Sequence, residues 1–409
     1  MESWILEEER KIPVLDQCAT LVVGGGIAGV SAAIAAARGG SDVILLEREY
    51  ALGGLATLGL ITIYLPLCDG RGSQMIYGLG EELLRLSIRH GAERNYPSAW
   101  LDGKDLEERK KKRFMTQFNP QIFALELEQL LCDLGVRILY GSTAVGVQME
   151  GDRIRAVVIE NKSGRGAIRA DAVIDCSGDA DICRLSGAET REYEAKNGLA
   201  SWYYYHSKGQ VQLKMFGLAD VVPEKGDQGS ATGNETVEVL TNKRYSGTDG
   251  GELSQMVLDA HRHMFADILK KREEDPKLVP VTMSMIPLVR MTRRLEGAYA
   301  LDDTETEKPF EDSIGTIGDW RKCGPVYEIP FRCLYGSSVR NLLAAGRCIS
   351  VTDSMWDITR VIPVCAVTGE AAGTAAALGN DFPNLQVEEL QKKLMSQHVR
   401  LHLAQDLQD

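Results

Sequence analysis

The chain has 409 residues, of which 44% are hydrophobic, and carries 46 basic against 58 acidic side chains, a formal net charge of −12. This length predicts two or three domains, or one large domain with an insertion. The negative charge argues against nucleic acid or an anionic membrane surface as the main partner. No run of 18 apolar residues occurs, so the sequence predicts no membrane-spanning helix.

Nine cysteines are scattered along the chain, and none forms a C-x-x-C pair. This usage argues against a zinc or iron–sulfur cluster and against a disulfide framework, and we predict no metal site. The acidic N-terminal segment does not resemble a secretion signal. Together these features predict a cytoplasmic protein with reduced, mostly buried thiols.

A strand–loop–helix–strand pattern occupies the most informative stretch of the sequence. The apolar run 18–23 predicts a buried parallel strand, residues 27–38 a helix that ends at a glycine pair, and residues 42–46 a second strand. A helix that begins directly after a strand presents free amides to phosphate. The pattern therefore predicts a dinucleotide site.

The loop between the first strand and the helix has the glycine spacing of dinucleotide-binding proteins. Gly24 permits the tight turn, Gly26 lets a phosphate approach the backbone, and Gly29 lets the helix pack on the strand. The amides of Ile27 and Ala28, at the start of the helix, then face the pyrophosphate.

An acid follows the second strand. Glu47 lies 18 residues past Gly29, where a carboxylate accepts hydrogen bonds from ribose hydroxyls, and Arg48 follows it. A glutamate in this place disfavours a 2′-phosphate, which leaves FAD or NAD.

Three later segments favour FAD. A glycine-pair loop follows the ribose acid, a buried strand over 172–176 ends in small residues, and the segment 341–378 contains a short strand followed by a long alanine-rich helix. No second glycine fingerprint occurs, so we predict no built-in NAD(P) domain. The further residues predicted to bind FAD are Gly53, Gly54, Leu55, Ala56, Thr57, Ala144, Val145, Ser177, Gly178, Asp179, Gly346, Arg347, Ile362, Pro363 and Ala366.

These segments together resemble the FAD-dependent oxidoreductase family of the glutathione-reductase-like flavoprotein superfamily, which is related to fumarate-reductase-type and heterodisulfide-reductase flavoproteins. The motifs that carry the resemblance include 290–297 and 329–332. The resemblance implies extended FAD in an α/β, Rossmann-like domain of three layers with a parallel central sheet. Family members often carry a His-Glu pair before the Arg-Val-x-Pro turn. Here residues 353–357 are DSMWD, so no acid–base histidine is carried over.

We predict a discontinuous FAD-binding domain over 14–190 and 285–384, with a helical excursion at 70–117. The segment 191–284, with strands in 200–220, polar loops in 221–252 and a helix over 253–275, is predicted to form an inserted α+β substrate domain. Residues 385–409 predict an amphipathic helical tail that could pack against a second subunit.

Four side chains are candidates for catalysis. Arg290 and Arg294 are predicted on one face of a strand, where they could hold a substrate carboxylate or stabilise an oxyanion. Salt bridges to the nearby Asp302 or Asp303 are the alternative. Arg360 precedes the turn predicted to face the flavin. His206 ends an aromatic run and could act as an acid or base, although a packed sheet histidine is the simpler interpretation.

The sequence therefore predicts an FAD-dependent oxidoreductase, a dehydrogenase or reductase that moves a hydride between flavin N5 and a small polar substrate bearing a carboxylate or hydroxyls. It predicts an external electron donor or acceptor and leaves homo-oligomer formation open. The alternatives are a flavoprotein electron-transfer subunit of a larger redox complex and a flavin-dependent enzyme without net redox chemistry.

Overall fold

The computed structural model describes Glu7 and residues 9–90, 98–101, 106–111, 115–217 and 240–404. Parts of the predicted helical excursion 70–117 and of the predicted loops 221–252 therefore lie outside the described residues.

The strands are β1 Val14–Val23, β2 Val43–Leu46, β3 Ile63–Tyr64, β4 Thr116–Gln117, β5 Arg137–Leu139, β6 Thr143–Glu150, β7 Arg153–Asn161, β8 Gly164–Asp175, β9 Thr190–Glu192, β10 Ser201–Ser207, β11 Gln210–Phe216, β12 Val279–Met283, β13 Arg293–Leu295, β14 Ser313–Gly318, β15 Val326–Pro330 and β16 Leu342–Ala344. The α-helices are α1 Ile27–Arg38, α2 Leu79–Ile88, α3 Ser98–Leu101, α4 Leu106–Lys111, α5 Pro120–Asp133, α6 Asp181–Leu185, α7 Gly250–Glu274, α8 Asp353–Thr359, α9 Ile362–Leu378 and α10 Val387–Ser396.

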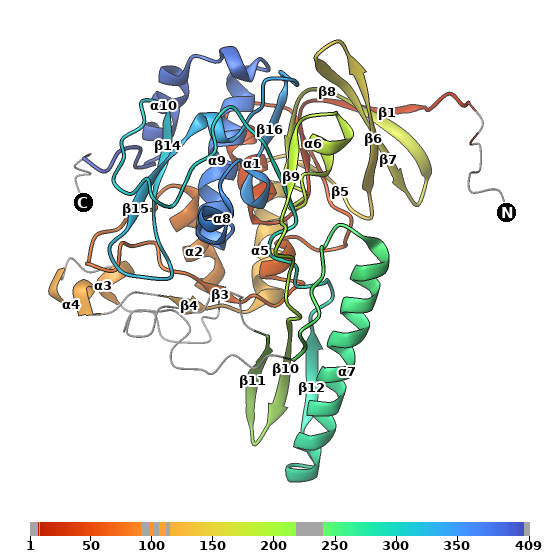
Figure 1. The fold of residues 1–409 in the computed structure, drawn as a ribbon, viewed down its shortest axis with the longest axis vertical. Coiled ribbons are helices and arrows are strands. Elements are labelled where there is room, and N and C mark those ends of the chain that lie inside the picture. Colours follow the sequence, from red (N-terminus) through yellow and green to blue (C-terminus); the bar gives the residue numbers. More distant parts are fainter. Residues whose placement is uncertain are drawn as a thin grey trace.

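A seven-stranded sheet forms the centre of the main body (Figure 1). Its strands lie in the order β5-β2-β1-β8-β7-β6, and β16 also pairs with β8. The strands β1, β2, β5, β8 and β16 run parallel, whereas β6, β7 and β8 pair antiparallel. The parallel strand β2 is buried along its whole length, as its apolar sequence predicts. The predicted α/β class with a parallel central sheet is confirmed.

Helices α1 and α9 pack side by side against the sheet, although they lie at opposite ends of the sequence. Two glycines of α9 make this contact backbone to backbone. A Cβ at Gly369 would lie 2.2 Å from the carbonyl oxygen of Ala28, and one at Gly373 would lie 2.1 Å from that of Ala32. Because a larger side chain would force the helices apart, these glycines fix how closely the late helix approaches the nucleotide loop.

A second, smaller unit projects from the body (Figure 1). It consists of the antiparallel sheet β11-β10-β12 and the long helix α7, and we call it the stalk. The Tyr203 hydroxyl on β10 donates a hydrogen bond to Asp267 on α7 at 2.6 Å, and Phe216 and Met264 are buried beside Tyr203. The strands predicted within 200–220 and the helix predicted at 253–275 are thus present.

The predicted tail helix is present as α10, but it belongs to the main body. Its Leu390 and Leu394 are buried in the core that also contains α9. Gln391 donates to the carbonyl oxygen of Ser313 at 3.0 Å. Because its own chain covers the apolar face of α10, that face is not available for a second subunit, contrary to our expectation.

No single helix in the described ranges is both long and apolar enough to cross a membrane, although α8 and α9, which meet at 91°, would meet the length and composition criteria as a pair.

Candidate functional site

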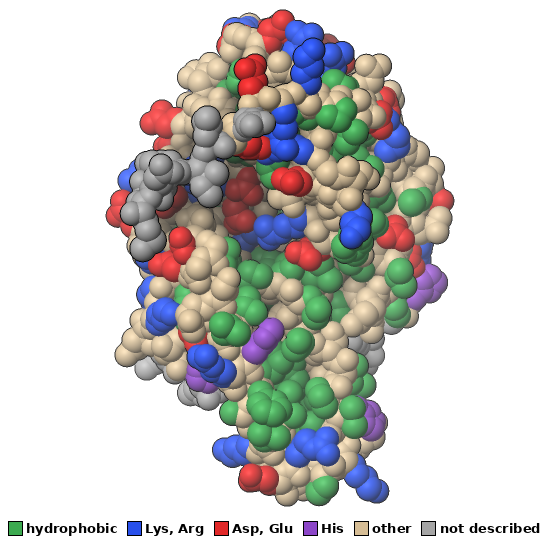
Figure 2. Space-filling model, turned by 90° about the vertical axis from the view of Figure 1, so that its right-hand side faces the viewer, with side chains coloured by type: hydrophobic (Ala, Val, Ile, Leu, Met, Phe, Trp, Pro, Cys, Tyr) green, Lys and Arg blue, Asp and Glu red, His purple; other side chains and the backbone are tan. Residues whose placement is uncertain are grey.

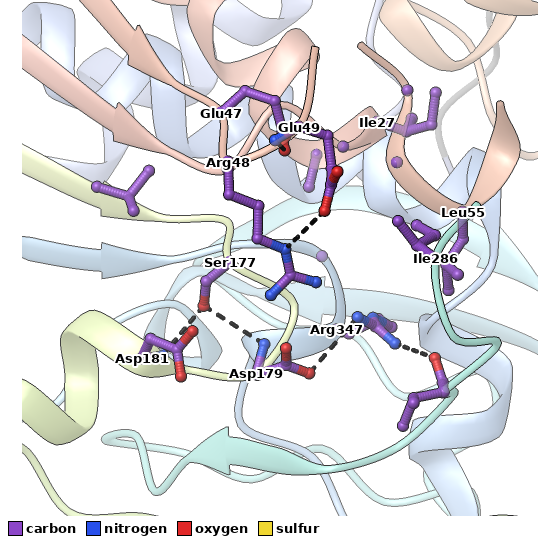
Figure 3. A pocket seen from close by; sticks show the side chains of 18 of the residues that line it. Ile27, Glu47, Arg48, Glu49, Leu55, Ser177, Asp179, Asp181, Ile286 and Arg347 are labelled. Carbon is purple, nitrogen blue, oxygen red and sulfur yellow. Dashed lines mark hydrogen bonds and ion pairs between the residues drawn. The ribbon is translucent and has the colours of Figure 1, made fainter. Parts of the chain in front are cut away.

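A cleft opens at the carboxyl ends of β1, β2, β8 and β16 and reaches the start of α9 (Figure 3). This is the edge at which parallel α/β sheets place their ligand sites. The structure brings together there most of the residues that the sequence indicated. Those that line the cleft are Gly24, Gly26, Ile27, Ala28, Glu47, Arg48, Gly53, Gly54, Leu55, Ala56, Ala144, Ser177, Asp179, Gly346, Arg347, Arg360 and Ile362.

The glycine loop has the geometry that a phosphate needs. A Cβ at Gly24 would lie 2.4 Å from the carbonyl oxygen of Cys176, and one at Gly29 would lie 1.8 Å from that of Gly24. At Gly26, in contrast, a Cβ would meet no atom within 4 Å, so this glycine faces open space. No side chain of the described residues caps α1 at Gly26. The first amides of α1 therefore keep their donors for an anion in the cleft.

The second glycine loop lies directly against the first. The amide of Gly53 donates to the carbonyl oxygen of Gly25 at 2.8 Å, and Gly53 and Gly26 form an isolated parallel bridge. Gly53 and Gly54 have φ angles of 97° and 55°, which only glycine adopts without strain. The two loops thus form one continuous wall, along which an extended diphosphate can lie.

Glu47 is held by backbone amides at the adenosine side of the cleft. Its carboxylate accepts from the amide of Gly25 at 2.7 Å and from that of Glu49 at 2.8 Å. Burial raises the pKa of Glu47, while these two hydrogen bonds oppose that shift. A carboxylate fixed in this way can accept hydrogen bonds from ribose hydroxyls, the role that the sequence suggested for Glu47.

The turn after β8 is organised by buried Asp175. Its carboxylate accepts from the hydroxyl of Ser177 at 2.6 Å and from the amide of Cys183 at 2.9 Å. This turn brings Asp179 and Asp181 to the cleft. Burial, with the nearby carboxylate of Asp179, raises the pKa of Asp181 to about 6, so the charge on this wall changes near neutral pH.

Two arginines face the same space from opposite walls (Figure 3). Arg48 follows β2, and its nearest acid is Glu49 at 3.7 Å. Arg347 follows β16, donates to the carbonyl oxygen of Val289 and lies 3.6 Å from Asp179. Guanidinium groups bind phosphate oxygens well, so both suit a diphosphate.

The far end of the cleft is formed by the break between α8 and α9. Arg360 lines the cleft there, and both its Nε, at 2.9 Å, and one terminal nitrogen donate to Oδ1 of Asp357. Asp357 is buried, and its Oδ2 has no hydrogen-bond partner among the described residues. The helix α9 begins at Ile362, also in the lining, without a side-chain cap. A cation and a helix N-terminus thus lie together at this end.

Several predicted residues lie behind the lining rather than in it. The Thr57 hydroxyl donates to the carbonyl oxygen of Leu52 at 2.5 Å, and a Cβ at Gly178 would collide with Arg347. Gly29 packs α1 against the loop, as noted above. The residues outside the lining are Gly29, Thr57, Val145, Gly178, Pro363 and Ala366.

The predicted pairing of Arg290 and Arg294 on one strand face is wrong. β13 begins only at Arg293, because the amides of Arg290 and Met291 donate to the side chain of Asn197 instead of to a strand partner. Arg290 donates to the carbonyl oxygen of Gly217 at 3.4 Å. Neither Arg290 nor Arg294 lines the cleft.

The other arginines of this motif serve the fold. Arg294 lies 3.1 Å from Asp353 and stacks on Trp356 at 4.9 Å, and Arg293 lies 2.8 Å from Asp181. The acids expected as partners, Asp302 and Asp303, are not the ones used here. His206 is exposed on the stalk, next to the turn between β10 and β11, and does not reach the cleft.

The sequence did not indicate one of the walls of the cleft. Gly247 and Leu253, before and within α7, line the cleft together with Ile286, Pro287 and Val289. The available signal was the apolar run Ile286-Pro-Leu-Val289 directly before the arginine motif. Its side chains make this part of the cleft apolar, unlike the charged adenosine side.

The residues present fit FAD. Gly26, which faces open space next to the free amides of α1, suits the diphosphate, and Glu47 suits the ribose. The apolar wall and Leu55 suit the flavin rings. Within the described ranges, no three His, Cys, Asp or Glu side chains gather at a spacing that would hold a metal ion.

The chain matches the family described as FAD dependent oxidoreductase over residues 20–222 and 228–394. It belongs to this family. The family membership that the sequence predicted is thus confirmed, and the family is one of oxidoreductases that use FAD.

Comparison with individual proteins gives more distant likenesses. The chain is 31% identical over 68 residues to a thioredoxin reductase of Ureaplasma parvum serovar 3, a match that spans 17% of this chain and 22% of that enzyme. The aromatic hydroxylase CabE from angucycline biosynthesis is similar with a TM-score of 0.44 and 13% identity, over 93% of this chain and 66% of its own. A geranylgeranyl bacteriochlorophyll reductase-like protein from Thermoplasma acidophilum gives 0.42 and 14%, over 94% and 84%.

Proposed function

We propose that this FAD-dependent oxidoreductase transfers a hydride between a small polar substrate and the flavin, and exchanges electrons with an external donor or acceptor. The observation that carries the proposal is the cationic end of the cleft. Arg360 lies there beside the N-terminus of α9, in the same cleft as the apolar side chains of Ile286 and Pro287. When bound, FAD supplies hydride chemistry at flavin N5.

The chain's own residues would bind and orient the reactants. The free amides of α1 and the side chains of Arg347 and Glu47 would hold the nucleotide half of FAD in place. The α9 N-terminus and Arg360 favour negative charge at the flavin end, because both present positive potential there. Ile286 and Pro287, which also line the cleft, would exclude water from the bound flavin.

Arg360 also suits the recognition of a substrate carboxylate or hydroxyl. Its contact with Oδ1 of Asp357 fixes the plane of the guanidinium, since two nitrogens donate to one oxygen. Arg290 and Arg294, which first suggested a polar substrate, have internal partners, so this specificity now depends on Arg360. We also propose a cytoplasmic location, on the reduced cysteines alone.

Anaerobic absorbance spectroscopy of the FAD-loaded chain tests the proposal. Small hydroxy acids are added to the oxidised protein, and small unsaturated acids or ketoacids to the dithionite-reduced protein. Loss or return of the flavin absorbance with one of these classes, and its slowing in Arg360→Gln, is the expected result. A spectrum that changes only when a redox protein is added contradicts the proposal in favour of an electron-transfer subunit. Substrate turnover without any flavin change contradicts it in favour of non-redox chemistry.

A further inference from the structure

The stalk exposes an unusual number of large apolar side chains. In the described part of the chain, fifteen such side chains are exposed, and eight of them lie on the stalk or in the segment that directly follows β12. They include Leu258, Phe265 and Leu269 on α7, and Val281 and Met285 on and after β12. Figure 2 shows apolar side chains gathered on the projecting lobe. Concentrations of this kind mark interaction surfaces.

Helix α7 is apolar on two opposite sides. Met256, Ala260 and Met264 are buried on the side that faces the body and the stalk sheet. At 100° per residue, Leu258, Phe265 and Leu269 project from the other side, where Phe265 is 63% exposed. An amphipathic surface helix carries one apolar stripe, and a helix with two is covered on both sides.

The outer stripe has the spacing of a coiled-coil seam and is symmetric about its own centre. Leu258, Arg262, Phe265 and Leu269 follow each other at intervals of four, three and four residues. If a second α7 packs antiparallel about the midpoint between residues 263 and 264, Leu258 meets Leu269 of the second copy. Arg262 then meets Phe265 of the second copy, a favourable cation–π pair.

Because the outer stripe of α7 is complementary to itself, we expect a second copy of the chain to cover it. A two-fold interface requires that when residue i contacts residue j, residue j contacts residue i, and the stripe meets this condition at every position. Arg262 is free to take part, because its only acid within ion-pair distance in the described structure is Asp259 on the same helix, and its side chain is 71% exposed. We propose that the chain forms a two-fold dimer in which α7 packs antiparallel on α7 of a second copy.

The size of the face is consistent with a dimer. The seam from Leu258 to Leu269 is about 16 Å long, which by itself is short for an interface of roughly 800 Å² per partner. A groove between α7 and residues 283–288 adjoins the seam, and exposed Met283 and Met285 lie along it. These side chains extend the face. Ile286 and Pro287 line both this groove and the flavin cleft, so the dimer would also brace the cleft wall.

The first test is the mass of the FAD-loaded full chain in solution. Sedimentation velocity at micromolar concentration should give twice the 44.9 kDa chain mass. The double variant Phe265→Glu, Leu269→Glu should sediment as a monomer with an unchanged flavin spectrum. The control is Leu125→Glu, an equally exposed leucine on α5, which should remain a dimer. A monomeric native chain, or a dimer that survives the double variant, overturns the proposal. Flotation of the native monomer with lipid vesicles would overturn it in favour of a membrane surface.

Cross-linking tests the antiparallel register. Leu258→Cys and Leu269→Cys are made separately in a Cys132→Ser background, since Cys132 is an exposed thiol. Under mild oxidation, the mixture of the two variants should form a covalent dimer, and each variant alone should not. Cross-linking of Leu258→Cys with itself would indicate a parallel pair and overturn the proposed arrangement.

Discussion

Gly26 is a position at which a substitution should weaken cofactor binding without disturbing the fold. Its φ of −66° and ψ of 179° are open to any residue, and an added Cβ meets no atom within 4 Å. Gly26→Ala should therefore fold normally and gain about 0.4–1 kcal/mol of stability, because alanine has less backbone freedom to lose on folding. The same methyl group would stand where a diphosphate reaches the amides of α1.

The expected loss is in FAD affinity alone. Displacing the diphosphate from one charge-assisted hydrogen bond costs about 1.5–3 kcal/mol, which corresponds to a roughly 10- to 150-fold higher Kd. Quenching of FAD fluorescence by the flavin-free chain measures this Kd, and urea unfolding measures the stability. Gly250→Ala, at a position that is equally open but absent from the cleft lining, should leave the Kd unchanged.

Gly29→Ala provides the opposite case. Its Cβ would lie 1.8 Å from the carbonyl oxygen of Gly24, so this variant should lose stability or fail to fold. An unaltered FAD affinity in Gly26→Ala would refute the placement of the diphosphate over this glycine. A Gly26→Ala chain as unstable as Gly29→Ala would refute the inference that Gly26 faces open space.

Three further predictions concern charged groups. Burial raises the pKa of Glu370 to about 8, so the unfolded chain ionises this group at a lower pH than the folded chain does. The contribution of Glu370 to the free energy of unfolding is therefore complete below pH 4.5 and falls by up to about 1.4 kcal/mol per pH unit as pH rises toward 8. Glu370→Gln, which can still accept from the amide of Leu79, should remove this part of the pH dependence in urea unfolding. Asp181 gains charge near pH 6 in the cleft, so FAD should bind more weakly above that pH, and titrations with Asp181→Asn should show a flatter pH profile. Arg360→Gln should lower the two-electron midpoint potential of the flavin by about 30 mV or more, because about 1.4 kcal/mol of stabilisation of the reduced form corresponds to 30 mV. Reference dyes measure this potential, and an unchanged value would place Arg360 away from the flavin.

The sequence predicted the parts of the site that local patterns encode. A strand, a tight glycine turn and a helix occur within the 25 residues from Val14 to Arg38, and their relative positions follow from strand and helix geometry. Glu47 follows from the same unit. The start of α9 was also predictable, because Pro363 and the alanine-rich run define a helix N-terminus.

The remaining parts depend on contacts between distant segments. Ile286, Pro287 and Val289 lie in the cleft because the stalk returns to the body there, and no periodicity in the sequence specifies that contact. Arg290 and Arg294 looked like a pair because strand alternation was assumed, whereas Asn197 interrupts the strand. The spacing of Leu390 and Leu394 correctly predicted an amphipathic helix, but it did not indicate which residues cover the apolar face of that helix.

The pairing of α1 with α9 has a consequence for synthesis of the chain. Roughly 320 residues separate the end of α1 from the start of α9, so at about 5–20 residues per second the ribosome needs roughly 16 to 65 s between them. Throughout that interval the face of α1 that contacts α9 lacks its native partner, although β1, β2, β5 and β8 can already pair with each other. The end of the cleft that α9 forms is therefore completed only late in synthesis, and until then the uncovered face of α1 is exposed to aggregation.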